Sequence, residues 1–250
     1  MTTSDTTGQY NISSYWGPRG ETPEDIAGRY IWMIEALARI DPVFTPWYFL
    51  AKKKVPFDEA RARLPALIAK DVGRDWSPRD GYRFGGTNSQ KFNPRSIGIR
   101  GQAGNSLPPI GFGNSVHLVT VSHPDYSTDA SIVTYDLFRA AMVAIIQAWE
   151  VTWCAAYPTD IMDFWPPVRH GHHFKLAWMT YVSPRFASLI RPPPDIESQA
   201  GTRGGVLMVA TRERFDVTNA EHMAAARAID AAMVPLNALP WPPESSLDPD

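Results

Sequence analysis

The segment from residue 15 to residue 50 constrains the fold most, because an aromatic-glycine turn, a helix start, an amphipathic helix and a second aromatic cluster follow without a gap. Thr22 and Asp25 have the spacing of a capping box, and Pro23 suits the first helical turn between them. Apolar residues then recur every three or four positions and predict one buried stripe: Ile26, Tyr30, Met33, Leu37 and Ile40. Such a helix needs a surface to pack on.

The composition is typical of a globular protein and argues against some classes of function. The 250 residues include 24 basic and 26 acidic side chains, and a net charge of −2 is too small to indicate a nucleic-acid binder. A hydrophobic fraction of 44% with nine tryptophans suffices for a packed core. Cys154 is the only cysteine, which excludes an internal disulfide and a cysteine metal cluster and fits a reducing compartment.

The two ends of the chain read differently from its middle. Residues 1–9 lack a basic start and an apolar run, so we expect a disordered N-terminus, no export signal and a cytoplasmic protein. No internal linker divides residues 10–239, which we expect to form a single domain, followed by a disordered tail over residues 240–250. No window approaches the ~18 to 20 apolar residues that cross a bilayer, so no membrane span is expected.

Helices and strands are predicted in groups. The helical patterns lie over residues 22–40, over residues 59–70 with a cap at Asp58 and a kink or a division at Pro65, over residues 135–149, and from Asn219 with Thr218 and Glu221 as a capping pair. The strand patterns lie over residues 43–50, 82–84, 96–101, 116–122, 151–157, 175–182 and 205–210. Because helices bracket the strand groups, we predict an α+β fold with a mainly antiparallel sheet, several packed helices and residues 116–122 at its centre.

One cluster has the composition of a metal site. His170, His172 and His173 lie close together in the sequence, with Asp160 and Asp163 as possible oxygen donors. Their spacing matches no established ligand pattern, and a solvated loop after two prolines explains them as well. We therefore expect no cofactor and no metal, and keep a metal-dependent enzyme using residues 170–173 as the alternative.

Other catalytic patterns are weak or missing. Cys154 with His117 or His123 could form a nucleophile and base, but a lone cysteine among aromatic residues is more often a small core residue. The sequence has no GxSxG elbow, no SxxK and no phosphate-binding glycine loop. Lys52, Lys53 and Lys54 are typical of a solvated loop. We expect a protein that is not an enzyme.

Motifs near both ends resemble one family. The N-terminal half carries Tyr15-Trp16-Gly17-x-Arg19-x-Glu21, Ala27, Leu37, Asp41-Pro42 and Trp47. The C-terminal half carries Trp178, Tyr181, Gly204-Gly205-Val206-Leu207, Phe215-Asp216 and Asn219-x-x-His222. Together they are similar to the immunity protein 52 family of bacterial toxin systems, over roughly residues 15–239. Residues 70–114 carry no landmark of that family, which leaves an insertion possible there.

The resemblance implies an α+β protein that binds and neutralises a cognate toxin. Such toxins commonly carry a restriction-endonuclease-like nuclease domain delivered by a secretion system such as type VI. Tight interfaces are enriched in Trp, Tyr and Arg, and carboxylates suit a basic nuclease. The candidate partner-binding residues are Trp16, Arg19, Glu21, Glu24, Asp25 and Trp47.

The same residues also have a structural interpretation. Trp16 would pack against the first helix, and Arg19 would pair with Glu21 to hold the corner before it. The expected partner is a protein, not nucleic acid and not a membrane, and the oligomeric state stays open.

Overall fold

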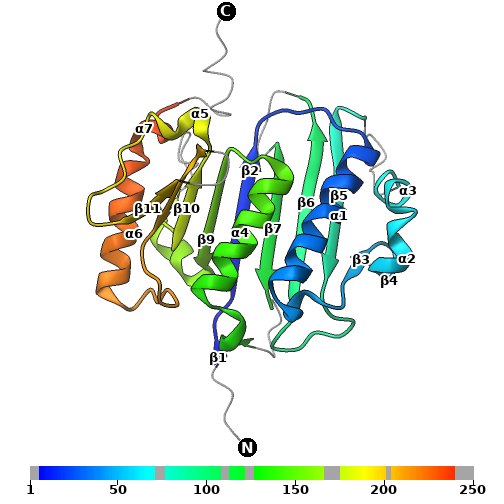
Figure 1. Cartoon of the computed structure of the whole chain (residues 1–250), viewed down its shortest axis with the longest axis horizontal. Helices are drawn as coiled ribbons and strands as arrows, with labels where there is room; N and C mark the ends of the chain where they lie inside the picture. The colour runs from blue at the N-terminus through cyan, green and yellow to red at the C-terminus, as the bar shows by residue number, and fades with distance from the viewer. Residues whose placement is uncertain are drawn as a thin grey trace, which may run out of the picture.

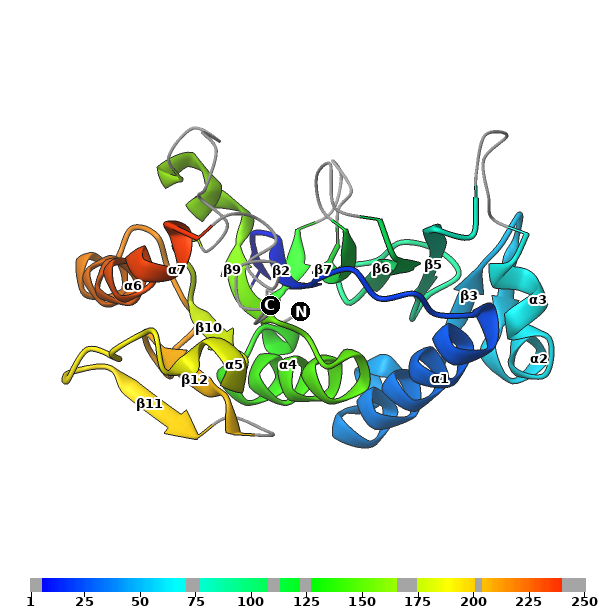
Figure 2. The ribbon, with the colours of Figure 1, turned by 90° about the horizontal axis from the view of Figure 1, so that it is seen from above.

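The computed structural model describes residues 6–70, 77–107, 113–121, 127–165, 175–200 and 204–239. One large sheet runs across the molecule, with helices packed against it (Figures 1 and 2). Ten of the described strands form it in the order β11-β12-β10-β9-β2-β7-β6-β5-β3-β4, and all neighbours are antiparallel. The predicted α+β class with a mainly antiparallel sheet is confirmed.

The strands of this sheet are β2 (Tyr10–Trp16), β3 (Tyr48–Leu50), β4 (Lys54–Pro56), β5 (Asp80–Thr87), β6 (Ile97–Asn105), β7 (Asn114–Thr120), β9 (Trp153–Pro158), β10 (Met179–Val182), β11 (Glu197–Ala200) and β12 (Val206–Val209). The α-helices are α1 (Pro23–Ile40), α2 (Phe57–Arg61), α3 (Leu64–Ile68), α4 (Tyr135–Trp149), α5 (Pro184–Ala187), α6 (Ala220–Ala232) and α7 (Val234–Asn237). Short 3-10 helices are η1 (Pro42–Phe44), η2 (Ala130–Ile132) and η3 (Thr159–Phe164). β7 lies between β2 and β6, as the sequence predicts for a central strand.

The start of α1 follows the predicted capping box. The Asp25 backbone N–H donates to the Thr22 hydroxyl at 3.2 Å, and the Thr22 N–H donates to the Asp25 carboxylate at 3.0 Å. The apolar stripe of the helix is buried from Ile26 to Leu37. α1 and α4 lie side by side on one face of the sheet (Figures 1 and 2), so this stripe helps to form the core.

Trp149, the last residue of α4, packs this helix against β2 and β5. Its ring stacks on Trp16 of β2 at 5.4 Å and on Phe84 of β5 at 5.0 Å between ring centroids. Phe84 in turn contacts Tyr30 of α1 edge-on at 5.5 Å. Aromatic residues that are far apart in the sequence therefore form one continuous part of the core beneath α1 and α4.

Strand β2 lies at the centre of the sheet, between β9 and β7, and the sequence patterns did not predict it. Polar residues interrupt its apolar alternation, yet Ser13 and Ser14 are buried. Each finds a partner inside: the Ser14 hydroxyl donates to the Val116 carbonyl at 2.8 Å, and the Ser13 hydroxyl lies 2.8 Å from that of Tyr157. Hydrogen bonds that only the assembled sheet provides make this polar strand compatible with burial.

Residues 70–114 contribute β5 and β6 to the middle of the same sheet, so their described part is not an insertion. Small residues leave room for aromatic rings there. A Cβ at Gly101 would lie 2.3 Å from the Phe84 ring, and one at Gly86 would lie 2.2 Å from the Tyr30 hydroxyl. Gly86 and Gly101 are thus strand positions packed under large side chains.

Several predicted element boundaries are wrong. Residues 43–50 begin with η1, and only residues 48–50 form a strand. The pattern over residues 59–70 is divided near Pro65 into α2 and α3, one of the two outcomes expected there, but α2 begins at Phe57 without a side-chain cap from Asp58. Asn219, not Thr218, caps α6, because its side chain accepts from the N–H groups of Glu221 and His222.

The ends differ partly from expectation. Thr6 and Thr7 form β1 and pair with β8 (Thr128–Asp129), so the described chain is already paired within the segment expected to be disordered. Residues 1–5 and 240–250 lie outside the described residues. Among the helices described, none combines the length and apolar character needed to cross a membrane.

Candidate functional site

Four charged residues form a cluster where α1 begins and α4 ends; we call it the charged corner. Arg29 lies 2.6 Å from the Glu21 carboxylate and 3.2 Å from that of Glu150. Arg19 lies 3.3 Å and 3.6 Å from the same two carboxylates. The Glu21 side chain is only 5% exposed, so the two guanidinium groups compensate a carboxylate that water barely reaches.

The charged corner also closes the C-terminal end of α4. Arg29 donates to the Ala148 carbonyl at 2.8 Å, and Arg19 donates to the Trp149 carbonyl at 3.0 Å. The last carbonyls of a helix lack partners within the helix, and cations suit its negative end. Burial is the main influence on the pKa of Arg19 and lowers it. The predicted pairing of Arg19 with Glu21 is present, and Arg29 and Glu150 join it without having been predicted from the sequence.

A shallow hollow of about 540 Å³ opens at this corner. It is lined by Arg19, Gly20, Glu21, Glu24, Asp25, Gly28 and Arg29. Four of the six candidate partner-binding residues therefore come together, but they differ in what they offer a partner. Glu24 and Asp25 are exposed, whereas Glu21 is committed to the two arginines.

Trp16 and Trp47 lie in the core instead of at the surface of this hollow. Trp16 is 4% exposed and lies between the Trp149 ring and the Arg19 guanidinium, which is 5.3 Å from its centroid. Trp47 is 5% exposed and donates its ring N–H to the Tyr30 hydroxyl at 2.8 Å. This placement favours the packing role for both tryptophans.

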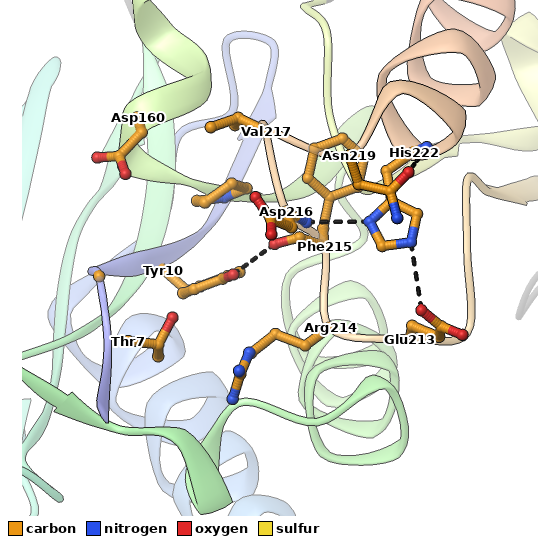
Figure 3. A pocket seen from close by; sticks show the side chains of 12 residues that line it. Thr7, Tyr10, Asp160, Glu213, Arg214, Phe215, Asp216, Val217, Asn219 and His222 are labelled. Atoms are coloured by element: carbon orange, nitrogen blue, oxygen red, sulfur yellow. Dashed lines mark hydrogen bonds and ion pairs between the residues drawn. The ribbon is translucent and has the colours of Figure 1, made fainter. Parts of the chain in front are cut away.

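A second hollow, of about 430 Å³, lies between residues 7–10 and the segment 213–222 (Figure 3). The loop before α6 lines one side, and the start of β2 lines another. The Tyr10 hydroxyl donates to the Phe215 carbonyl, which connects the two. His222 is buried; its Nδ1 accepts from the Asp216 N–H at 3.1 Å, and its Nε2 lies 3.5 Å from Glu213.

The motif Phe215-Asp216 with Asn219-x-x-His222 therefore shapes the turn into α6. Asn219 caps the helix, and His222 in its first turn holds the backbone of the preceding loop. Because Nδ1 accepts a hydrogen bond, the neutral ring carries its proton on Nε2, facing Glu213 (Figure 3). Both ring nitrogens are thus engaged within the fold.

Cys154 and His117, one of the two candidate pairs of nucleophile and base, do not meet. Cys154 is paired in register with Ser14, and His117 with Ser13, so alternation places their side chains on opposite faces of the sheet. Burial raises the pKa of the Cys154 thiol, which keeps it protonated. His117 Nδ1 bonds to the Ser13 hydroxyl at 2.9 Å, and burial lowers its pKa to about 4, so the ring is neutral at pH 7.

The histidine cluster cannot be placed in the same way. His170, His172 and His173 lie outside the described residues, as does His123. Within the described ranges, no group of three or more His, Cys, Asp or Glu residues is arranged to hold a metal ion.

Comparisons with known proteins identify the chain's family. The family model described as immunity protein 52 matches residues 8–235. Among solved structures, the Pseudomonas aeruginosa T6SS protein PA0821 is similar at 14% identity and a TM-score of 0.47, over 93% of this chain and 74% of that one. No curated protein matches the sequence. Since the family model covers both halves, including β5 and β6 in the middle, the chain belongs to the immunity protein 52 family.

Proposed function

We propose that this protein is the immunity partner of a bacterial toxin and neutralises it by forming a stoichiometric complex. The observation that carries the proposal is the family match over residues 8–235. The fold supports it, because a large sheet backed by α1 and α4 gives a rigid scaffold for an interface (Figure 2). Inhibition by binding requires such a surface and no catalytic group.

The toxin in this proposal is a restriction-endonuclease-like nuclease delivered by a secretion system. Its substrate lies in the cytoplasm, so an inhibitor must meet it there, and a single buried cysteine suits a reducing compartment. These finer statements rest on the family resemblance of the motifs around Trp16 and Phe215.

The contact surface in this proposal includes the rim of the charged corner. The exposed Glu24 and Asp25 carboxylates lie at the start of α1, next to a hollow that a basic side chain of the toxin can enter. Charge of this kind at an interface mainly steers association and selects the partner. In this proposal Glu21 and Arg19 do not contact the toxin through their charges, because these charges are already paired within the charged corner.

Co-expression with the toxin encoded by the neighbouring gene tests the proposal. We expect protection from killing, a co-purifying complex with one copy of each protein, and loss of DNA degradation when the purified proteins are mixed. The matched control is an immunity protein of the same family from an unrelated gene pair, which should not protect. Protection without a complex would contradict the proposal. Bound metal together with turnover of a small substrate would instead support the enzyme alternative.

A further inference from the structure

The sheet has a second face, and the strand register assigns side chains to it. Trp16 and Phe84 point toward α4, where both stack on Trp149. Their neighbours Tyr15 and Arg83 therefore point the other way. Cross-strand pairs add further residues to that side: Arg83 lies opposite Gln102, and Arg100 lies opposite His117. We call the surface formed by Tyr15, Arg83, Arg100, Gln102 and His117 the open face.

The described helices cover only part of this side of the sheet. η3 and α6 lie over it toward the β9, β10 and β12 end, where Trp165 packs edge-on against Tyr157 at 5.0 Å (Figure 2). Over β5, β6 and β7 none of the described helices lies on this side, whereas α1 and α4 occupy the opposite side (Figure 2). Among the described residues, the helical cover thus ends where the open face begins.

Two arginines dominate the charge of the open face. Arg83 and Arg100 are exposed, and neither guanidinium bonds to another described residue. They are diagonal neighbours on adjacent strands, ~7–8 Å apart at the backbone, close enough for both to reach one partner group. The cross-strand row through Arg83, Gln102 and Ser115 contains no carboxylate, nor does the row through Arg100 and His117.

Five other arginines have a clear role in the fold. Arg19 and Arg29 close a helix end, and Arg61, Arg95 and Arg212 each pair with a carboxylate. Arg83 and Arg100 have no such partner among the described residues, although they lie side by side on adjacent strands. Arg and Tyr are enriched in interface hot spots, and the half-buried rings of His117 and Tyr15 continue the open face from the exposed Arg100.

Resting on the proposed function, we propose that the open face binds a carboxylate-bearing surface of the cognate toxin, with Arg83 and Arg100 as its anchors. A guanidinium fork matches a carboxylate in two parallel hydrogen bonds, and two adjacent forks match an acidic cluster. His117, which lies opposite Arg100, and Tyr15 add a half-buried, neutral surface, and their rings meet edge-on at 5.3 Å. The ring of His117 is uncharged at neutral pH, so the arginines alone set the charge.

A protein carboxylate fits this surface better than a nucleic-acid backbone. Binding to a phosphate chain needs many cations along a track, and its affinity scales with the number of phosphates neutralised. The described open face offers two, on a chain of net charge −2. A compact pair of arginines suits a local acidic patch instead.

Charge reversal tests the assignment with the catalytically inactivated toxin of the neighbouring gene as the probe. Arg83→Glu/Arg100→Glu should weaken its affinity about 30-fold or more, the loss expected for a hot-spot pair. The matched control is Arg63→Glu/Arg227→Glu, which changes the net charge equally at exposed arginines elsewhere and should change affinity less than about threefold. The melting temperature of both variants should match that of the wild type, because none of the four guanidinium groups is bonded within the described fold.

The outcomes separate this inference from the proposed function. If the wild-type protein does not bind the toxin, the proposed function and the inference both fail. If the wild type binds and Arg83→Glu/Arg100→Glu binds equally well, only the inference fails. Binding of an oligonucleotide by the free protein that the double variant loses would assign the face to phosphate and overturn it. Should charge reversal lower the melting temperature, Arg83→Gln/Arg100→Gln replaces it with the same expectation.

Discussion

Trp16 illustrates how one residue can satisfy two interpretations until its surroundings are known. The motif around it resembles a family signature, and tryptophan is common at interfaces. In the structure its ring is 4% exposed and is fixed by Trp149 below and Arg19 above. Its role at this scale is to hold the end of β2 against α4, and any effect on toxin binding passes through the fold.

Truncating this ring should therefore cost stability. Trp16→Ala removes a buried aromatic stack, and we expect the free energy of unfolding to fall by ~3 to 5 kcal/mol, measured by denaturant titration. Trp32→Ala is the matched control, because Trp32 lies on α1 and is 41% exposed; it should cost under about 1 kcal/mol. A normal unfolding curve for Trp16→Ala combined with lost toxin binding would show that the ring is an interface anchor.

At the scale of elements, the charged corner joins two helices that are far apart in the sequence. Arg29 of α1 reaches the last turn of α4 and Glu150, whose backbone φ of 52° and ψ of 49° end that helix in the left-handed region. A non-glycine residue in this region carries a small strain, which the surrounding contacts must offset. The corner thus stabilises both the end of α4 and its position beside α1.

Removing one cation from the corner should be costly. Arg29→Gln leaves the Glu21 carboxylate with Arg19 alone and frees the Ala148 carbonyl, so we expect a loss of ~2 to 4 kcal/mol in unfolding free energy. Arg39→Gln on the same helix is the control and should stay within about 0.5 kcal/mol.

A double-mutant cycle separates the charge effect from other consequences of that change. Glu21→Gln/Arg29→Gln removes the carboxylate together with its partner and should cost less than the sum of the single changes. Additive losses would mean that the two residues do not interact, which would contradict the pairing at 2.6 Å.

Local signals explain which elements the sequence could predict. α1 and α4 carry both a cap and a 3.6-residue period, and both appear at the predicted places. β2 lacks a clear local signal of a buried strand, because two of its buried residues are serines. Their hydrogen-bond partners lie on strands over 100 residues away. The same reason explains why only part of the charged corner was predicted. Arg19 and Glu21 are close in the sequence, whereas Glu150, directly after α4, is far from both in the sequence.

For the whole molecule, the small net charge of −2 is the sum over surfaces of opposite sign, one acidic and one basic. The rim of the charged corner carries the carboxylates of Glu24 and Asp25 at the start of α1. The open face carries Arg83 on β5 and Arg100 on β6. A toxin that contacts both must carry charges of both signs. Because the two surfaces share no residue, changes to each should affect binding independently.

The corner's part in association can be tested without disturbing the fold. Changing Glu21 would break the arginine pairs, so the informative variant is Glu24→Gln/Asp25→Asn, at two exposed carboxylates. Asp25→Asn keeps a side-chain oxygen that can accept the Thr22 N–H of the capping box. We expect its association rate with the toxin to fall at least about threefold at low salt and its salt dependence to weaken, measured by stopped-flow mixing, because rim charges act mainly on encounter. Asp58→Asn/Glu59→Gln makes the same charge change in the first turn of α2, also at exposed positions, and should leave the rate unchanged. Equal rates for both variants would place the encounter surface elsewhere, leaving the open face as the charged surface to examine.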